Sequence, residues 1–326
     1  MTEGLIGNTD LVLGFSLDAF TDVGFWTRVG VTAGILTIFN LGLQLNVGYT
    51  GIVNFGQAGF MAIGAYTVAI LVEKESVPFL LTIPIGIAIA IAFGLLVGLP
   101  SLRLRADYFA IATIAFAEAV RLTAQNARGL TEGNQGIYGF DSEWDNISET
   151  IEGWLEATVW SDPDQLFPLL LVVWASVTVL TLGLYFLQKT PWGRVLRAIR
   201  EDEDAARALG KNAFAYKLQS LAISAAIGAI AGMFLALSLR FVIPSEFAPT
   251  FTFIGYAALI AGGLASYPGV AAGAVFISIV YEAPRFLDIE NEESVRFILI
   301  GLILILLMAF RPQGAFGKRE EMVLGE

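Results

Sequence analysis

The sequence contains no cysteine and no histidine among its 326 residues. The chain therefore forms no disulfide and carries no thiol nucleophile, and it lacks the commonest metal ligand and the usual proton shuttle near neutral pH. Charge is also sparse, since 15% of the residues are charged, 56% are hydrophobic and the mean hydropathy is +0.70. This composition is more apolar than that of soluble domains and indicates an integral membrane protein.

The first 22 residues lack a basic region and contain four acidic residues, so we expect no cleaved signal peptide. The net charge is −11 and the isoelectric point is near 4.6. Because the acidic residues are spread over several connections, we interpret them as the surface of a halophilic protein, which hydrated carboxylates keep soluble. The alternative is that a single acidic external loop accounts for most of the negative net charge.

Apolar residues form blocks long enough to cross a bilayer as helices. They predict an all-α fold, a polytopic transmembrane helix bundle of about eight to ten membrane segments with a glycine-broken helix in each half. Nine candidate segments are 29–47, 55–72, 79–100, 107–125, 166–187, 217–239, 253–265, 269–283 and 295–311. They form one membrane domain over 29–317, between an N-terminal segment, 1–28, and a tail, 318–326.

Glycines and amides interrupt the first two membrane segments. Gly48, Gly51, Gly56 and Gly59 alternate there with Asn46, Asn54 and Gln57. Hydrocarbon tolerates open backbone and amide side chains only where protein or water covers them, and such broken helices are typical of transport paths. We predict a path for a polar solute that is lined by Asn46, Gly51, Asn54, Gly56 and Gln57. The alternative is that the amides only satisfy the open backbone.

Glu118 is a further candidate for the path, because it lies within an otherwise apolar run, Tyr108–Leu122. A carboxylate at membrane depth must face the bundle interior or be paired. Arg121 follows three residues later, at a spacing that permits an ion pair within the helix. A structural ion pair near the outer interface is therefore the alternative to a gating role.

A second break, Gly262–Gly269, and the basic residues predict the orientation. Seven basic residues lie between Lys189 and Lys217, whereas Arg128 is the only one between 126 and 163. Basic connections remain in the cytoplasm. This places the N-terminus and the acidic loop 126–165 outside, and the loop 189–213 and the C-terminus inside, provided that 253–283 crosses twice.

The basic loop reads as two short helices. Arg194, Arg197 and Arg200 share one face, acidic residues follow from Glu201, and Gly210 is placed to end the second helix. Short amphipathic helices on a cytoplasmic face suit docking into a groove of a partner. The alternative is a solvated loop that obeys the positive-inside rule.

Four stretches resemble the branched-chain amino acid permeases of ATP-binding cassette (ABC) transporters, in the expected order over about 30–317. They are Gly-Tyr-Thr-Gly-Ile-Val-Asn-Phe-Gly-Gln-Ala-Gly (48–59), Leu-Arg-Ala-Asp-Tyr-Phe-Ala-Ile-Ala-Thr (104–113), Ala-Ile-Arg-Glu-Asp-Glu-Asp-Ala-Ala-Arg-Ala-Leu-Gly (198–210) and Arg-Pro-Gln-Gly (311–314). The last three are similar to the LivM-type subunit rather than to the LivH-type subunit. Position 57 departs from the family, which commonly has histidine where Gln57 stands, and Thr131-Glu132-Gly133 departs from its Thr-Gly-Gly pattern.

The resemblance implies a permease subunit for branched-chain amino acids in the cell membrane. It implies a LivH-type permease, two cytoplasmic ATPase subunits and an external substrate-binding protein as partners, with no cofactor and no nucleic acid. It also implies that 198–210 couples to the ATPases, through Arg200, Glu203, Asp204, Ala205, Ala206, Leu209 and Gly210. No Walker A motif occurs in the sequence, so we expect a transport subunit without ATPase activity of its own.

Other functions remain possible from the sequence. A permease of the same superfamily for urea, short amides or simple sugars has nearly the same pattern. A stand-alone secondary transporter would need an ion or proton site in the membrane, for which Glu118 is the only clear mid-span candidate. A membrane enzyme is disfavoured, because histidine, cysteine and a paired-carboxylate motif are absent.

Overall fold

The computed structural model describes residues 22–158, 164–264, 266–286, 292–310 and 314. The predicted N-terminal segment up to residue 21, the tail 318–326 and most of the motif 311–314 lie outside this part of the chain. The longer helices are α1 (Val23–Leu43), α2 (Gln57–Glu73), α3 (Phe79–Ser101), α4 (Ala106–Asn126), α6 (Ser142–Thr158), α7 (Phe167–Lys189), α8 (Pro191–Glu201), α10 (Ala213–Leu239), α11 (Thr250–Gly262), α12 (Tyr267–Phe286) and α13 (Glu292–Phe310). The short elements are η2 (Gln44–Thr50), α5 (Arg128–Thr131), η3 (Gly133–Gln135), β1 (Ile137–Tyr138), α9 (Glu203–Ala208), β2 (Phe241–Val242) and η4 (Pro244–Phe247).

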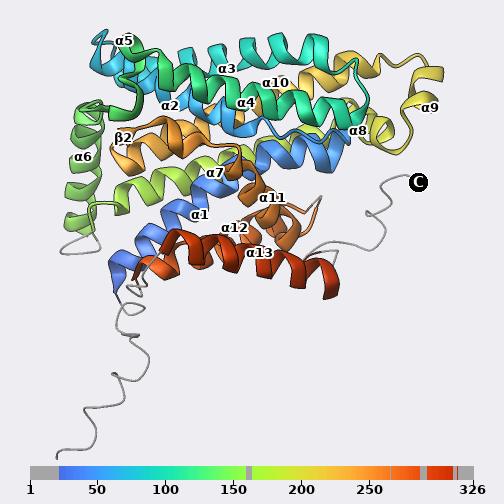
Figure 1. Ribbon diagram of the computed structural model, residues 1–326. Coiled ribbons are helices and arrows are strands. Elements are labelled where there is room, and N and C mark those ends of the chain that lie inside the picture. Colours follow the sequence, from blue (N-terminus) through green and yellow to red (C-terminus); the bar gives the residue numbers. More distant parts are fainter. Residues whose placement is uncertain (1–21, 159–163, 265, 287–291, 311–313, 315–326) are drawn as a thin grey trace, which may run out of the picture.

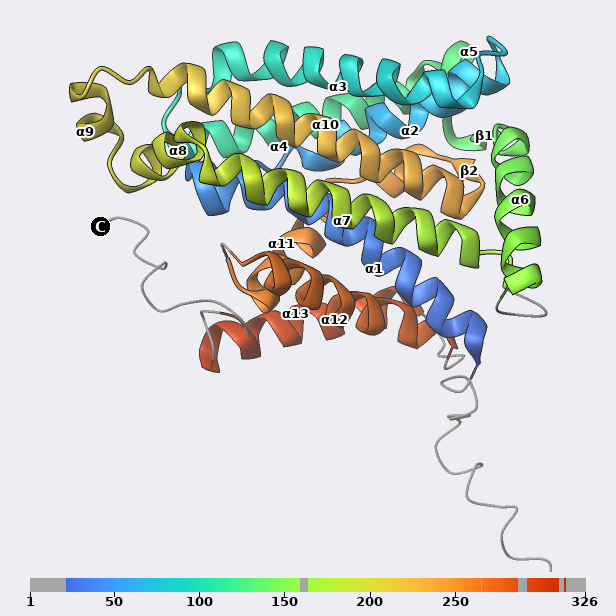
Figure 2. The same cartoon turned by 180° about the vertical axis from the view of Figure 1, so that it is seen from behind.

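Most long helices run between two ends of the molecule, and different elements cover each end (Figures 1 and 2). Helix α6 stands across one end, beside α5 and the two-stranded antiparallel sheet in which Ile137 pairs with Val242. Helices α8 and α9 cover the other end. We call these the α6 end and the α8 end. The acidic connection and the basic connection therefore lie at opposite ends of the bundle.

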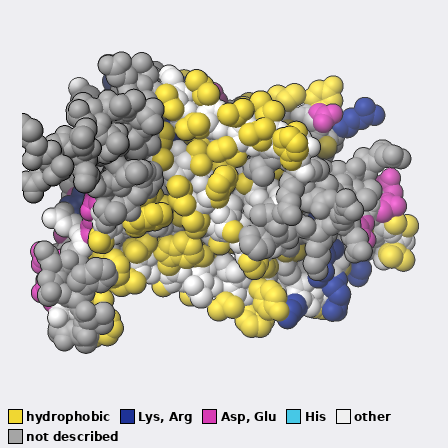
Figure 3. All heavy atoms as spheres, turned by 90° about the horizontal axis from the view of Figure 1, so that it is seen from below, with side chains coloured by type: hydrophobic (Ala, Val, Ile, Leu, Met, Phe, Trp, Pro, Cys, Tyr) yellow, Lys and Arg dark blue, Asp and Glu magenta, His cyan; other side chains and the backbone are white. Residues whose placement is uncertain are grey.

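Helices α1 and α10 form the centre of the bundle, and α3 and α7 lie at its surface. The most apolar window of the segment Val23–Thr50 is 89% buried, whereas the corresponding windows of α3 and α7 are each 22% buried. These segments and α10 are long and apolar enough to cross a membrane. An apolar helix with little buried surface suits contact with lipid. Figure 3 shows a further apolar face, on the side of α13, with Lys and Arg gathered toward the α8 end.

The first predicted break is a π-helical turn followed by an irregular segment. Helix α1 continues into η2, which ends at Gly51, where φ is +74°. This left-handed conformation favours glycine. Residues 51–56 form neither helix nor strand, and α2 begins at Gln57. The second break is confirmed as well, because α11 ends at Gly262 and α12 begins at Tyr267.

Helices α2 and α10 approach each other closely through glycine. A Cβ atom on Gly232 would lie 1.8 Å from the carbonyl oxygen of Met61, and one on Gly64 would lie 2.1 Å from that of Ala229. Neither position accommodates a side chain. Small residues permit such backbone contact between membrane helices. This contact fixes α2, the helix that follows the break, against the centre of the bundle.

The predicted all-α membrane fold is confirmed. Each of the nine predicted segments overlaps one helix of the described chain, in the order α1, α2, α3, α4, α7, α10, α11, α12 and α13. The acidic connection contains a helix that was not expected, α6. Its Trp144 and Leu155 are buried, and the Glu143 carboxylate accepts a hydrogen bond from the Phe79 amide at the start of α3, at 2.6 Å.

Candidate functional site

Ser224 of α10 is the residue around which the polar side chains of the first break meet. Its hydroxyl accepts a hydrogen bond from Asn46 Nδ2 at 2.9 Å. Its single proton is shared between the Gly42 carbonyl and Gln57 Oε1, each at 2.9 Å, and Gln57 Nε2 donates to the Ser224 carbonyl at 3.0 Å. One turn away, the Ser220 hydroxyl donates to Asn46 Oδ1 at 3.1 Å. Helix α10 thus holds the two sides of the break together.

The irregular segment 51–56 and the start of α2 are satisfied by the side chain of Asn54 and by side chains from two neighbouring elements, α4 and α11. Asn54 Oδ1 accepts from the Gly56 amide at 2.8 Å, and the Asn54 carbonyl accepts from the Tyr256 hydroxyl of α11 at 2.9 Å. The Phe55 amide donates to Thr113 of α4 at 3.1 Å, and the Ala58 amide to Thr252 of α11 at 3.2 Å. Backbone that would otherwise be unpaired in hydrocarbon is therefore covered by protein.

The predicted path residues of the break come together, and within this chain they serve its structure. The side chains of Asn46, Asn54 and Gln57 are fully buried and hydrogen-bonded. A Cβ atom on Gly56 would lie 2.9 Å from the Thr113 carbonyl, and one on Gly51 would lie 3.1 Å from Cγ of Arg200. Both glycines therefore permit close packing. Contact of these residues with a solute stays a prediction.

Two further amides lie on the same helix and differ from this network. Asn40 and Gln44 are fully buried, and neither side-chain amide has a hydrogen-bond partner among the described residues. They are four residues apart, so they share one face of the helix. Asn40 lies against α11, because its Oδ1 would be 2.9 Å from a Cβ atom on Gly255. Unpaired buried amides are costly and mark candidate polar contacts for a solute or water.

Glu118 is not brought together with the amides of the break. Its carboxylate receives two hydrogen bonds from Arg121, at 2.5 and 2.9 Å, and its side chain is 36% exposed. The expected pair within the helix is therefore present. A role of Glu118 in the path stays a prediction.

A second acidic residue within a predicted membrane segment, Glu282, was not among the candidates predicted from the sequence. Glu282 lies on α12, is only 6% exposed and accepts a hydrogen bond from Thr32 of α1 at 3.1 Å. It is more buried than Glu118. It lies at the end of the predicted segment 269–283, close in sequence to the acidic residues Asp288, Glu290, Glu292 and Glu293, so it resembled part of a loop.

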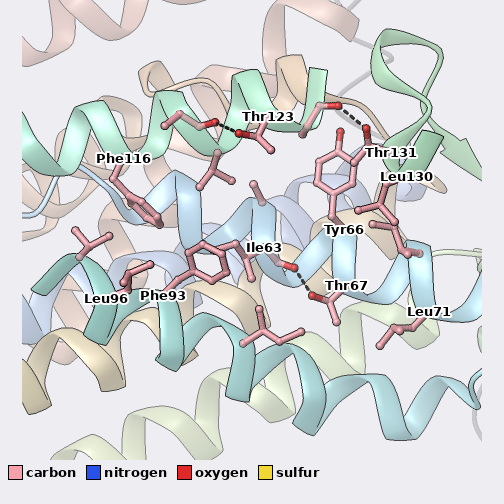
Figure 4. A pocket seen from close by; sticks show the side chains of 17 residues that line it. Ile63, Tyr66, Thr67, Leu71, Phe93, Leu96, Phe116, Thr123, Leu130 and Thr131 are labelled. Carbon is pink, nitrogen blue, oxygen red and sulfur yellow. Dashed lines mark hydrogen bonds between the residues drawn. The ribbon is translucent and has the colours of Figure 1, made fainter. Parts of the chain in front are cut away.

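A large crevice between α2, α3 and α4 is apolar and does not suit a zwitterionic solute (Figure 4). Its volume is about 430 Å³, and aromatic and aliphatic side chains such as Phe93, Leu96 and Phe116 line it. The hydroxyl groups of Thr67 and Thr123 donate to carbonyls of their own helices, so these residues present their methyl groups. An ammonium or carboxylate group would lose its hydration here without replacement.

The residues predicted to couple to the ATPases divide into exposed and inward-facing groups. Leu209 is 81% exposed and the Asp204 side chain 95% exposed, and Ala205 and Gly210 are exposed as well. Ala206 is buried. Glu203 is half-buried and binds Lys217 of α10 as well as Arg207, the latter at 2.6 Å. The exposed residues form a surface on α9 and the turn that follows it.

Arg200 faces the interior and joins the loop to the break. Its guanidinium Nη1 donates to the carbonyl of Gly48 in η2, and its aliphatic part covers Gly51. Helix α8 is further fixed to α10, because the Trp192 indole donates to Gln219 at 2.7 Å. The predicted coupling element is therefore in direct contact with the broken helix.

Among the described residues, no group of three or more acidic side chains is arranged to hold a metal ion.

Comparison with known proteins identifies relatives over most of the chain. A family model described as the permease component of the branched-chain amino acid transport system matches residues 26–308. The high-affinity branched-chain amino acid transport system permease protein LivM of Escherichia coli (strain K12) is 34% identical over 295 residues, 86% of this chain and 67% of the relative. A probable LivM of Methanocaldococcus jannaschii is 29% identical over 88% of this chain and 91% of its own length. The LivH protein of Escherichia coli (strain K12) is 25% identical over 89% of this chain and 94% of its own. No solved structure matches the chain.

Proposed function

The chain belongs to the branched-chain amino acid transport permease family and is a permease subunit of an ABC importer, and from this premise we propose that its solute is a branched-chain amino acid. The observation that carries the proposal is the likeness to LivM of Escherichia coli over 86% of the chain. In this proposal the chain passes the amino acid across the membrane and does not hydrolyse ATP.

The partners in this proposal follow from the two ends of the bundle. A LivH-type permease would complete the membrane part, the pair would bind two ATPase subunits, and one of these would contact the exposed surface around Leu209 at the α8 end. An external substrate-binding protein would dock at the α6 end. The separation of the acidic and basic connections in Figure 1 supports this division.

The orientation in the membrane is part of the proposal. The N-terminus and the α6 end would lie outside, and the α8 end and the C-terminus in the cytoplasm. The basic loop, with seven Lys and Arg between Lys189 and Lys217, supports it.

We propose that the solute passes along the face of α1 that carries Asn40 and Gln44, beside the broken stretch. Both amides are buried without partners in the described chain, so they are free to pair with a polar solute when the bundle opens. The amides of Asn46 and Gln57 would hold the break in shape. In the same proposal, Glu118, which lies on α4, is near the path.

The test is reconstitution of the chain with its LivH-type partner, both ATPases and the binding protein in proteoliposomes. We expect ATP-driven uptake of leucine, isoleucine or valine, and no uptake when ATP is omitted. ATP-driven uptake of urea, a short amide or a simple sugar that leucine does not inhibit would assign the other solute class of the superfamily. Uptake by this chain alone, driven by an ion gradient, would contradict the proposal.

A further inference from the structure

A polar pocket lies at the α8 end, where the turn between α3 and α4, the break and the helices α8 and α9 meet. Its volume is about 650 Å³. The turn between α3 and α4 forms one wall, residues 50–53 of the break form another, and α8 with α9 closes it. These elements meet at the right of Figure 1. Its basic residues Arg103 and Arg105 belong neither to the predicted path nor to the predicted coupling residues.

The charge of the pocket is opposite to that of the chain. Its lining contains five basic side chains against two acidic ones, Glu203 and Asp204, whereas the whole chain has a net charge of −11. The basic side chains are Arg103, Arg105, Arg200, Arg207 and Lys217. Lys217 and Arg207 both bind the single carboxylate of Glu203, so the acidic side chains do not neutralise the five basic ones and the lining carries an excess of positive charge. Concave sites with charge of one sign concentrate ions of the other sign.

A long helix also begins in the pocket. Helix α4 starts at Ala106, which lines the pocket, and the residue before it, Arg105, makes no side-chain bond to cap the helix. The first hydrogen bond of the helix is donated by the Phe109 amide to the Arg105 carbonyl, at 2.9 Å. The amide groups that precede it point toward the start of the helix, and such groups favour an anion. Arginine side chains and helix amides are the groups that bind phosphate.

We propose that this pocket binds a phosphate group, through Arg103, Arg105 and the start of α4. The phosphate can come from the headgroup of an anionic lipid or from free phosphate. The pocket contains the turn between α3 and α4 and the start of α4, so in this proposal it lies where membrane helices leave the bilayer, within reach of lipid headgroups. A bound phosphate would touch the turn at α4, the break and the coupling helices together.

The simpler account of Arg103 and Arg105 is that they only set the orientation of the chain in the membrane. That account requires positive charge at the α8 end and no particular position for it. A matched pair of double variants separates the two. Arg103→Gln with Arg105→Gln removes two charges from the pocket, and Arg194→Gln with Lys211→Gln removes two exposed charges at the same end outside it.

The experiment uses the full chain, purified in detergent and reconstituted in nanodiscs. Binding of inorganic phosphate is titrated in detergent, and retention of phosphatidylglycerol against phosphatidylcholine is measured by mass spectrometry in 1 M KCl. At that salt concentration, diffuse attraction of charged lipids is screened over about 3 Å, so only a seated headgroup is retained. We expect the pocket variant to lose at least tenfold in binding, and the outside variant to bind like the parent chain.

Retention of phosphatidylglycerol but not of phosphatidylcholine, with weak binding of inorganic phosphate, assigns the lipid as the source. Binding of inorganic phosphate without retention of phosphatidylglycerol assigns free phosphate. Equal binding by both double variants, or no binding by the parent chain, overturns the proposal. Because none of these measurements uses transport, their failure is distinct from a failure of the proposed import function. The cooperative unfolding of each variant is recorded on the same samples, and the single variants Arg103→Gln and Arg105→Gln replace the pocket variant if it does not fold.

Discussion

The guanidinium of Arg200 on α8 donates a hydrogen bond to the carbonyl of Gly48, in the π-helical turn that ends the first membrane helix. The two residues are 152 positions apart in the sequence. The side chain also covers Gly51, at which the helix is broken. Helix α8 is therefore joined to the break by a charged hydrogen bond, without an intervening residue.

Replacing Arg200 by alanine tests this connection. Loss of a hydrogen bond to a charged group lowers the free energy of unfolding by about 1–2 kcal/mol for a half-buried side chain. In the reconstituted importer we expect ATP hydrolysis to continue while leucine uptake per ATP falls several-fold. The measurement is the ratio of uptake to hydrolysis. Arg194→Ala on the same helix is the control, since Arg194 is exposed, and unchanged coupling in the Arg200 variant would refute the connection.

Leu209 is the second test, because it is the exposed apolar residue of the proposed ATPase surface. Leu209→Glu should leave the free energy of unfolding within about 0.5 kcal/mol, since the side chain is 81% exposed. We expect the ATPase subunits to co-purify with this variant much more weakly than with the parent chain. This substitution is cleaner than a change at Gly210 or Glu203, because Gly210 has a φ of +78° and Glu203 binds Lys217. Lys211→Glu, two residues further on, should have little effect, and normal co-purification of the Leu209 variant would exclude this surface.

The orientation is tested with single cysteines, and the parent chain has none to react in the background. Ser142 at the start of α6 and Lys211 after α9 are both exposed and lie at opposite ends of the bundle. A membrane-impermeant thiol reagent should label Ser142→Cys in intact cells and Lys211→Cys only after lysis. The reverse pattern would invert the proposed orientation and place the coupling surface outside.

The helices and their breaks could be predicted from the sequence because their signals are local. Blocks of apolar residues locate each helix, although α1 begins at Val23, six residues before the predicted segment 29–47, and the glycines near Gly51 and Gly262 mark the two breaks. Helix α6 was missed, because its acidic composition hides the few apolar residues, such as Trp144, by which it packs. Amphipathic helices with so little apolar surface resemble loops in composition.

The partners of the amides could not be predicted. Ser220 and Ser224 are two hydroxyl groups in an apolar helix, and no local pattern shows that they meet Asn46 from a distance of more than 170 residues. The contact of Arg200 with Gly48 is hidden for the same reason. Such pairings depend on how the helices pack, and the sequence supplies only the donor and acceptor types.

Asn40 and Asn46 offer a matched test of structure against transport, because both are fully buried asparagines of the same helical segment. Asn46 is hydrogen-bonded to Ser224 and Ser220, whereas Asn40 has no partner among the described residues. Asn46→Leu should therefore lower the free energy of unfolding by about 1 kcal/mol, the magnitude of two hydrogen bonds between membrane helices. Asn40→Leu removes an unpaired amide and should raise it by about 1 kcal/mol.

The more stable variant, Asn40→Leu, should therefore be the one with the greater loss of leucine uptake per assembled complex. If the face of Asn40 lines the path, Asn40→Leu is more stable but imports leucine at least several-fold more slowly, because the solute loses a polar contact. Asn46→Leu should lose uptake only in proportion to the complex that fails to assemble. Uptake and assembly are measured on the same preparation, with unfolding followed in detergent. A stabilised Asn40 variant with normal uptake would remove Asn40 from the path and leave its unpaired amide without a role in transport.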